Sequence, residues 1–178
     1  MVYLRSDHLV IRDLMAEDAE IITREEIAQG WHQTIDKYLK RLEDQNQGRC
    51  IALAAEYDGQ VAGYINIYPN PEAGPFGGKN IPEIVDFGVL EKFRRKGIGA
   101  RLMDQAEKIA GEYADRVYLG VGLHAGYGSA QRMYAKRGYI PDGSGVWYGN
   151  KPCDPYETYP NDDDLILYMS KKLDQASE

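Results

Sequence analysis

The sequence has few cysteines and few histidines. Its 178 residues include two cysteines, Cys50 and Cys153, which lie far apart and have no second cysteine or histidine beside them. Two isolated cysteines do not make the disulfide framework of a small secreted protein or a cysteine-rich zinc site. We therefore expect neither a disulfide framework nor a metal site.

Long apolar runs are also missing. No stretch approaches the roughly 20 apolar residues that a helix needs to span a bilayer. The first residues, Met1 to Asp7, lack the pattern of a secretory signal. We expect a cytoplasmic protein with no membrane partner.

Positive charge is in deficit. The chain has 28 acidic and 21 basic residues, a net charge of -7. Nucleic-acid binding usually requires a basic surface, so nucleic acid is not expected as a partner, whereas a cationic amine is not repelled. Apolar residues at 43% and charged residues at 28% are ordinary globular values. The length predicts one domain over residues 1–178.

A strand followed by a helix stands at the centre of the sequence. Ile84 to Leu90 is a mostly apolar run after Pro82, which is typical of a buried strand. Apolar residues then recur at helical spacing from Ile98 to Tyr113. The turn between them contains three cations and two glycines: Arg94, Arg95, Lys96, Gly97 and Gly99.

This turn suits a phosphate group. The first N–H groups of a helix lack intrahelical partners, and the helix dipole is positive at that end. A nucleoside-triphosphate loop would need Lys-Ser or Lys-Thr after a glycine, and the sequence has neither. A dinucleotide fingerprint starting at Gly97 would need a small residue where Leu102 stands. The pattern present is R-x-x-G-x-G, from Arg94 to Gly99.

That pattern, after a strand and at the start of an amphipathic helix, resembles the signature of the GNAT superfamily of N-acetyltransferases. In that superfamily the loop holds the pyrophosphate of acetyl-CoA, which the resemblance implies as co-substrate here. The backbone of the preceding strand would pair with the pantetheine arm and polarise the thioester carbonyl. The implied cofactor-binding residues are Phe87, Gly88, Val89, Arg94, Arg95, Lys96, Gly97, Ile98, Gly99 and Ala100.

The remaining elements follow from periodicity and turn signals. Asp58-Gly59 between two apolar runs predicts a hairpin. A strand on either side of the central helix favours a parallel pairing. We expect strands at His8 to Leu14, Arg49 to Tyr57, Gln60 to Tyr68, Arg116 to Val121 and Leu165 to Ser170, helices at Ala16 to Ala28 and Thr34 to Asn46, and loops over 69–80 and 141–164.

Together these elements predict an α/β fold of GNAT type. The sheet would be mixed and partly antiparallel, with about six or seven strands and helices on both faces. A rival interpretation rests on Gly120, Gly122 and Ala125, which match a dinucleotide loop after a strand. Gly126 and Gly128 oppose it, because they interrupt the helix that such a loop must open.

A second segment carries the family resemblance. Ala130, Tyr134 and Gly138-Tyr139 match the N-x-x-A-x-x-x-Y-x-x-x-G-[FY] pattern of many GNAT members, on a short helix for which Ser129 is a plausible N-cap. In those proteins the tyrosine lies near the sulfur of acetyl-CoA, which implies that Tyr134 is the general acid that protonates the leaving thiolate. The alternative is a tyrosine that faces the core. Where the family has asparagine, this chain has Tyr127.

A base is needed as well, because an amine is protonated near neutral pH and cannot attack a thioester until it loses a proton. Two carboxylates lie near the right place: Glu83 enters the central strand, and Asp86 lies within it. Histone-type GNAT members place a glutamate eleven residues before the first motif position, which is Glu83 here. Other members place it on the following strand, where this chain has Gly122. We expect Glu83 to be the base, against the alternative of a solvated carboxylate.

The predicted function is transfer of an acetyl group from acetyl-CoA to a primary amine by direct attack. The acceptor would be a small molecule or a peptide, and the resemblance allows a homodimer. The alternative is a CoA-binding sensor or interaction module without turnover. The run Asp162-Asp163-Asp164 would either contact a cationic acceptor or form a solvated turn.

Overall fold

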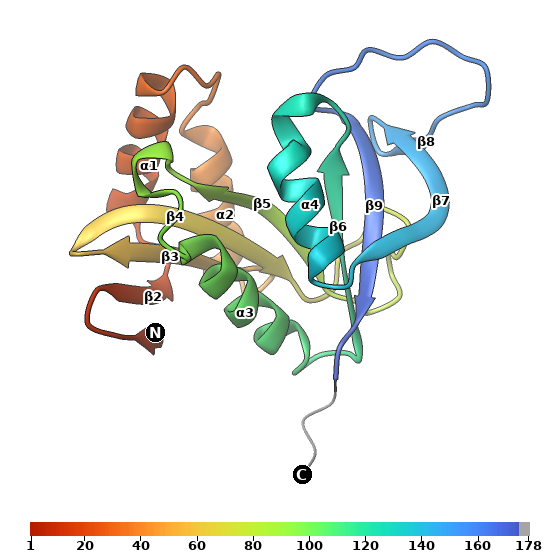
Figure 1. Ribbon diagram of the computed structural model, residues 1–178. Coiled ribbons are helices and arrows are strands. Elements are labelled where there is room, and N and C mark those ends of the chain that lie inside the picture. Colours follow the sequence, from red (N-terminus) through yellow and green to blue (C-terminus); the bar gives the residue numbers. More distant parts are fainter. Residues whose placement is uncertain (175–178) are drawn as a thin grey trace. The chain divides into compact units, whose positions relative to one another are not determined.

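The computed structural model describes residues 1–174 (Figure 1). The chain divides into two compact units. The first unit consists of Met1–Tyr68 and Val85–Ile109, and the second of Pro69–Ile84 together with the chain from Ala110 onward. Strand β5 (Glu83–Val89) contributes to both. The mixture of strands and helices confirms the predicted α/β class.

In the first unit the strands follow one another in sequence order from β1 to β5. The pairings of β1 with β2, β2 with β3 and β3 with β4 are antiparallel. Besides β5, its elements are β1 (Val2–Arg5), β2 (Leu9–Asp13), α1 (Ala16–Ala28), α2 (Asp36–Asn46), β3 (Ile51–Tyr57), β4 (Gln60–Tyr68), η1 (Glu91–Phe93) and α3 (Ile98–Ala110) up to Ile109.

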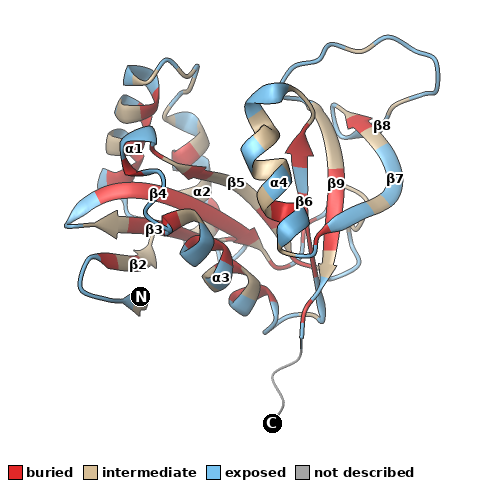
Figure 2. Ribbon diagram, in the orientation of Figure 1, coloured by how far each residue is buried: buried red, intermediate tan, exposed pale blue. Residues whose placement is uncertain are grey.

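The core of the first unit lies where helices α1 and α2 meet strands β3 and β4. Figure 2 shows β4 as an almost continuous buried strand. The hairpin between β3 and β4 turns at Asp58 and Gly59, whose φ angles of 49° and 75° fit a type I′ turn. Buried core residues here are Leu14, Ala19, Ile22, Tyr38, Cys50, Ala52, Ala54, Val61 and Tyr64.

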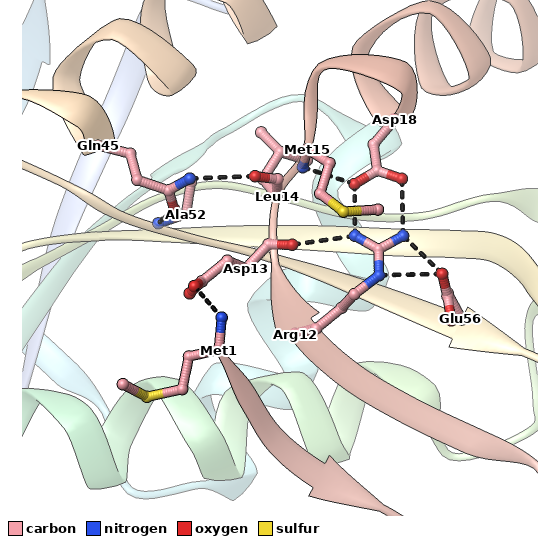
Figure 3. A network of polar contacts seen from close by, with 9 residues as sticks. All are labelled: Met1, Arg12, Asp13, Leu14, Met15, Asp18, Gln45, Ala52 and Glu56. Carbon is pink, nitrogen blue, oxygen red and sulfur yellow. Dashed lines mark hydrogen bonds and ion pairs between the residues drawn. The ribbon is translucent and has the colours of Figure 1, made fainter.

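A polar network fixes the start of α1 (Figure 3). The Arg12 guanidinium donates to both carboxylate oxygens of Asp18, at 2.6 and 2.9 Å, and to Glu56 at 2.6 Å. Asp18 also accepts the backbone N–H of Met15 at 2.7 Å, which caps the helix. These bonds tie β2 to α1 and β3, and hydrogen bonding to Asp18 raises the pKa of Arg12.

The second unit has the strand order β5, β6, β9, β7, β8. Strands β5 and β6 are parallel, with Glu83 opposite Tyr118 and Ile84 opposite Leu119, which confirms the predicted parallel pairing. The other pairings are antiparallel. Its further elements are β6 (Arg116–Gly122), η2 (Ala125–Tyr127), α4 (Gly128–Lys136), β7 (Ile140–Tyr148), β8 (Lys151–Pro152) and β9 (Leu165–Lys172).

The described chain has nine strands, more than the six or seven predicted. The prediction of a loop over 141–164 is wrong at its start, because β7 and β8 lie there. Gly143 and Gly145 adopt positive φ angles, and the pairing of β7 with β9 shifts register between Pro141 and Val146. These glycines form an irregular stretch inside a strand rather than ending it.

Two helix starts also differ from prediction. Helix α2 begins at Asp36, two residues after the predicted start at Thr34, and its N-cap is Ile35. Helix α4 has its N-cap at Tyr127, two residues before the predicted N-cap Ser129. In neither case does the N-cap side chain accept a hydrogen bond from the helix. The sequence therefore predicted both helices but not their first residues.

Several findings concern the described residues only. Within residues 1–174, no helix combines the length and the apolar composition that crossing a bilayer requires. The same residues contain no cluster of histidine, cysteine, aspartate and glutamate side chains able to hold a metal ion. Both cysteines are free, and burial raises the pKa of the Cys50 thiol to about 12.

Candidate functional site

The cationic turn lies in the first unit, between β5 and α3. After η1 the backbone reverses through Arg95, with a φ angle of 63°, and Gly97, with a φ angle of 76°. Helix α3 then starts at Ile98, whose side chain is buried, and the N–H of Arg101 bonds to the carbonyl of Gly97 at 3.1 Å. Arg94, Arg95 and Lys96 are exposed. The turn therefore presents three cations beside a helix N-terminus.

The turn is open at Gly97. A Cβ atom added there would meet no heavy atom within 4 Å. At Gly99, in contrast, an added Cβ would lie 3.1 Å from Cζ of Phe87 and 3.6 Å from a methyl carbon of Val89. Gly97 thus leaves room for an outside group to approach the backbone, whereas Gly99 lets α3 pack closely against β5.

Weak contacts hold two of the three cations, Arg94 and Lys96. The Arg94 guanidinium lies 5.8 Å from the ring centroid of Trp31 and 3.5 Å from a carboxylate oxygen of Glu91. The Lys96 ammonium lies 4.8 Å from the ring centroid of Tyr57. Exposed contacts of this kind are worth about 1 kcal/mol or less, so an anion could displace them.

Strand β5 is distorted just before Phe87. Asp86 has a φ angle of 49°, a left-handed conformation that is rare for residues other than glycine. Its carboxylate accepts two hydrogen bonds from Arg41, at 2.6 and 2.9 Å. The side-chain amide of Asn66 donates to the carbonyls of Val85 and Asp86, each at 3.2 Å. Groups from α2 and β4 therefore hold the distortion in place.

Gly88 of β5 lies close to Gly63 and Tyr64 of β4. A Cβ atom at Gly88 would lie 2.8 Å from Cζ and Oη of Tyr64, and one at Gly63 would lie 2.7 Å from the carbonyl oxygen of Gly88. Both positions require glycine for steric reasons. The backbone of β5 therefore runs against the edge of the Tyr64 ring.

Tyr134 lies in the second unit, on α4. Its side chain is buried, at 6% exposure, and its ring centroid lies 5.9 Å from that of Tyr139. Burial raises the pKa of Tyr134, so the hydroxyl keeps its proton at neutral pH. A buried, protonated phenol is chemically able to act as a proton donor, although the same burial is what a purely structural core tyrosine would show.

Glu83 also lies in the second unit, at the start of β5. Its carboxylate is 3.1 Å from the hydroxyl of Tyr118, which donates the hydrogen bond and is itself fully buried. Burial and the nearby Glu83 raise the pKa of Tyr118. Burial, followed by Glu83 and Asp142, raises the pKa of Tyr168 to about 12. Glu83 thus sits among protonated phenols.

Gly122 and Tyr127 depart from the family pattern and lie together. The Tyr127 hydroxyl donates to a carboxylate oxygen of Asp163 at 2.9 Å, and Nε2 of His124 is 2.9 Å from the same oxygen. These hydrogen bonds lower the pKa of Asp163, with the His124 contact as the larger cause. Asp163 is therefore hydrogen-bonded to Tyr127 of η2 and to His124, which follows β6, while its side chain stays 78% exposed in the turn before β9.

The structure brings part of the predicted site together. In the first unit, Phe87 and Val89 pack against Gly99 at the start of α3, beside the cationic turn. Glu83 and Tyr134 lie in the second unit. Sequence reasoning did not find the residues that support β5, namely Arg41, Asn66 and Tyr64. Gly88 next to a buried tyrosine leaves no periodic signal that could have revealed them.

The comparisons with known proteins agree with this picture. A sequence model described as the acetyltransferase (GNAT) family matches residues 11–139, which is more than half of the chain. A search of curated proteins finds no significant sequence match.

Solved structures of similar fold include several acetyltransferases. Ard1 from Thermoplasma volcanium is 21% identical, with a TM-score of 0.68, and the alignment covers 93% of this chain and 98% of Ard1. A ribosomal-protein-alanine N-acetyltransferase from Brucella melitensis is 21% identical, with a TM-score of 0.65 and coverage of 92% and 99%. RimL in complex with coenzyme A is 9% identical, with a TM-score of 0.71 and coverage of 98% and 99%. At these identities the likeness shows the fold alone.

Proposed function

We propose, from the premise that the chain belongs to the acetyltransferase (GNAT) family, that it transfers the acetyl group of acetyl-CoA to a primary amine by direct attack. Acetyl-CoA is the acetyl donor of this family. The observation that carries the proposal is the open cationic turn at Gly97, where an anionic group can reach both the backbone and the start of α3.

In the first unit, the turn would hold the diphosphate of acetyl-CoA. Arg94, Arg95 and Lys96 would supply positive charge, and the backbone from Gly97 to Ala100 would supply N–H donors. The backbone of Phe87, Gly88 and Val89 would pair with the pantetheine arm and polarise the thioester carbonyl. The support of β5 by Arg41, Asn66 and Tyr64 favours this role, because a preorganised strand needs no rearrangement on binding.

In the second unit, Tyr134 would protonate the departing thiolate and Glu83 would take the proton of the amine. The position of Tyr134 on α4 supports the first role, since a buried phenol held in one place by its helix can donate its proton to a leaving group. The hydrogen bond from Tyr118 supports the second, since it fixes the carboxylate of Glu83 in one orientation.

A primary amine is the acceptor that the chemistry favours. Neither cysteine belongs to the phosphate turn or to the Tyr134 segment, and the raised pKa of Cys50 leaves it a poor nucleophile, so a covalent thiol relay has no support. Two relatives, RimL and the Brucella melitensis protein, are described as acetyltransferases of ribosomal proteins, which makes a peptide amine one reasonable acceptor.

The test is release of coenzyme A from acetyl-CoA in the presence of a panel of amines. The panel should include small monoamines, diamines and peptides with a free amino terminus, and the free thiol is measured. We expect at least one amine to raise thiol release above the rate without acceptor. Binding of acetyl-CoA without release for any amine would instead indicate a sensor or interaction module.

A further inference from the structure

A buried carboxylate lies outside the residues discussed so far. Glu26 of α1 is fully buried. Its carboxylate accepts the hydroxyl of Tyr64 at 2.6 Å on one oxygen and the hydroxyl of Tyr38 on the other, and the two hydroxyl oxygens are 3.2 Å apart. We call Glu26, Tyr38 and Tyr64 the buried cluster.

The buried cluster is costly for the fold. Among residues 1–174, Glu26 makes no ion pair, and its hydrogen bonds come from neutral phenols. Removing a carboxylate from water without a counter-ion costs several kcal/mol, of which two hydrogen bonds recover only part. A carboxyl group that is buried with two phenols as its hydrogen-bond partners is a candidate for function rather than for stability.

A primary amine of the chain itself lies over the cluster. Lys37, in the first turn of α2, places its ammonium nitrogen 4.7 Å from the ring centroid of Tyr38 and 5.5 Å from that of Tyr64. Both distances fit cation–π contact. Lys37 is half-buried, so its amine has left bulk water only in part.

The same Tyr64 ring touches β5. Its Cζ and Oη lie 2.8 Å from the position of a Cβ atom at Gly88. Gly88 is one of the residues proposed to pair with the pantetheine arm. One tyrosine ring therefore contacts the amine of Lys37 on its face and the proposed thioester-binding strand at its edge.

We propose that Lys37 is an acetylation site of the protein itself, with the buried cluster as the base. This inference rests on the proposed function. In this step the Lys37 side chain moves from the ring face to the Tyr64 hydroxyl, which takes a proton from the ammonium and passes its own to Glu26. The free amine then attacks the carbonyl carbon of acetyl-CoA, the carbon–sulfur bond breaks, and the thiolate takes up the second proton of the nitrogen. The products are acetyl-lysine and coenzyme A.

The hydroxyl protons needed for this relay are present at neutral pH. Burial, together with Glu26, raises the pKa of both Tyr38 and Tyr64. Acetylation removes the positive charge of Lys37 and with it the cation–π contacts, so the modified side chain should no longer lie over the rings.

The test uses the purified full chain and acetyl-CoA labelled with carbon-13 in the acetyl group, without an added acceptor. Peptide mass spectrometry measures the rate of labelling at each lysine. Lys108, exposed in the last turn of α3, serves as the reference for uncatalysed chemical acetylation. We expect labelling of Lys37 to be faster by about 10²-fold, the lower end of what a positioned base contributes.

Two variants test the relay. Tyr64→Phe keeps the ring and removes the hydroxyl, and Glu26→Gln removes the charge. Each should lower the rate at Lys37 towards that of Lys108, while Tyr113→Phe, which changes an exposed tyrosine on another segment, should leave it unchanged. Circular dichroism checks that each variant is folded. If Glu26→Gln does not fold, Tyr64→Phe, the milder change, still tests the relay.

The other outcomes separate the two proposals. Equal labelling of Lys37 and Lys108 would overturn this inference, as would fast labelling that both variants leave unchanged. Release of coenzyme A to an added amine with Lys37 unlabelled would overturn it while the proposed function stands. If no amine releases coenzyme A and no lysine is labelled, both proposals fail.

Discussion

Gly122 and Tyr127 occupy one space: a Cβ atom on Gly122 would lie 2.3 Å from Cδ2 of the Tyr127 ring. The family resemblance led us to compare position 122 with a catalytic glutamate in some members and position 127 with an asparagine. In the structure these two differences from the family pattern, at positions 122 and 127, lie in direct contact. A side chain at 122 and the present placement of Tyr127 exclude each other, which also explains why β6 offers no base at that point.

Gly122→Ala should therefore displace the Tyr127 ring and destabilise the protein by about 1 to 3 kcal/mol, the usual cost of overpacking. Adding Tyr127→Ala should recover part of that loss, so the two changes should couple in a double-mutant cycle followed by urea unfolding. Gly128→Ala is the control, because its added Cβ meets nothing within 4 Å and lies in a helix. Strictly additive effects would contradict the shared space.

Gly97→Leu should abolish heat from coenzyme A in titration calorimetry. The leucine side chain would stand where the turn is now open, and it would strain a backbone with a φ angle of 76°. Gly59→Leu is a matched control, since Gly59 has a φ angle of 75°, also with nothing within 4 Å. Both variants should lose similar stability, whereas only Gly97→Leu should lose binding. Retained binding would remove the phosphate role from this turn.

Tyr134→Phe should lower kcat by about 10²- to 10⁴-fold, the range for loss of a general acid, while the Kd for acetyl-CoA stays nearly constant. The phenyl ring preserves the packing of this buried side chain, so the change removes only the hydroxyl. The exposed Tyr113→Phe is the control. An unaltered kcat would leave Tyr134 as a core residue.

Glu83→Gln should remove the acidic limb of the pH profile of kcat/KM, because that limb reports protonation of the base in the free enzyme. The amide can still accept the hydrogen bond from Tyr118, so the local structure should survive. Glu72→Gln, an exposed position on the loop before β5, is the control. A profile that Glu83→Gln does not move would place the base elsewhere.

Stability should fall at acid pH through Asp44. Burial alone would raise the pKa of this carboxyl, but hydrogen bonds from Tyr68 at 2.7 Å, Lys40 at 2.9 Å and Arg49 outweigh burial and lower it below the ordinary value of 3.8. A carboxyl group whose pKa is lower in the folded than in the unfolded state stabilises the protein at pH values above its unfolded-state pKa. This stabilisation is lost as the pH falls through the folded-state pKa. The contribution should therefore be complete near neutral pH and decline below about pH 4.

Asp44→Asn isolates that contribution. At pH 7 the variant should be less stable by about 1.5 to 3 kcal/mol, the usual worth of hydrogen bonds to a charged group. The difference between the two proteins should narrow as pH falls below 4, as measured by urea unfolding at several pH values. A constant difference across that range would show that the charge of Asp44 is not its source.

Much of the fold could be predicted from local signals. The helix predicted over Ala16 to Ala28 has those bounds in the structure, and Asp58-Gly59 does form the hairpin turn. Periodicity and turn chemistry suffice there because each element is determined by its own residues. Strand β7 was missed because its pairing with β9 tolerates a register shift around Gly143 and Gly145, and local sequence cannot indicate that partner.

The same distinction applies to the candidate site. The cationic turn was predictable, since its residues are contiguous and the glycines of the pattern R-x-x-G-x-G indicate where the backbone must turn. The buried cluster was not, because Glu26, Tyr38 and Tyr64 come from three elements and meet only in the folded first unit. In the sequence Glu26 is one more acidic residue on a helix. Its spacing from Ala19 and Ile22 places it on the buried face, but its two phenol partners lie on other elements.

The left-handed backbone at Asp86 is expected to affect stability and activity in opposite directions. Asp86→Gly would relax the φ angle of 49° at no steric cost, yet it would also release Arg41 and loosen the strand on which the thioester is proposed to lie. Selection for thermal tolerance alone would tend to discard such strained positions, since natural proteins keep them for function at the expense of stability. A laboratory evolution campaign on this enzyme should therefore select for turnover and heat resistance together.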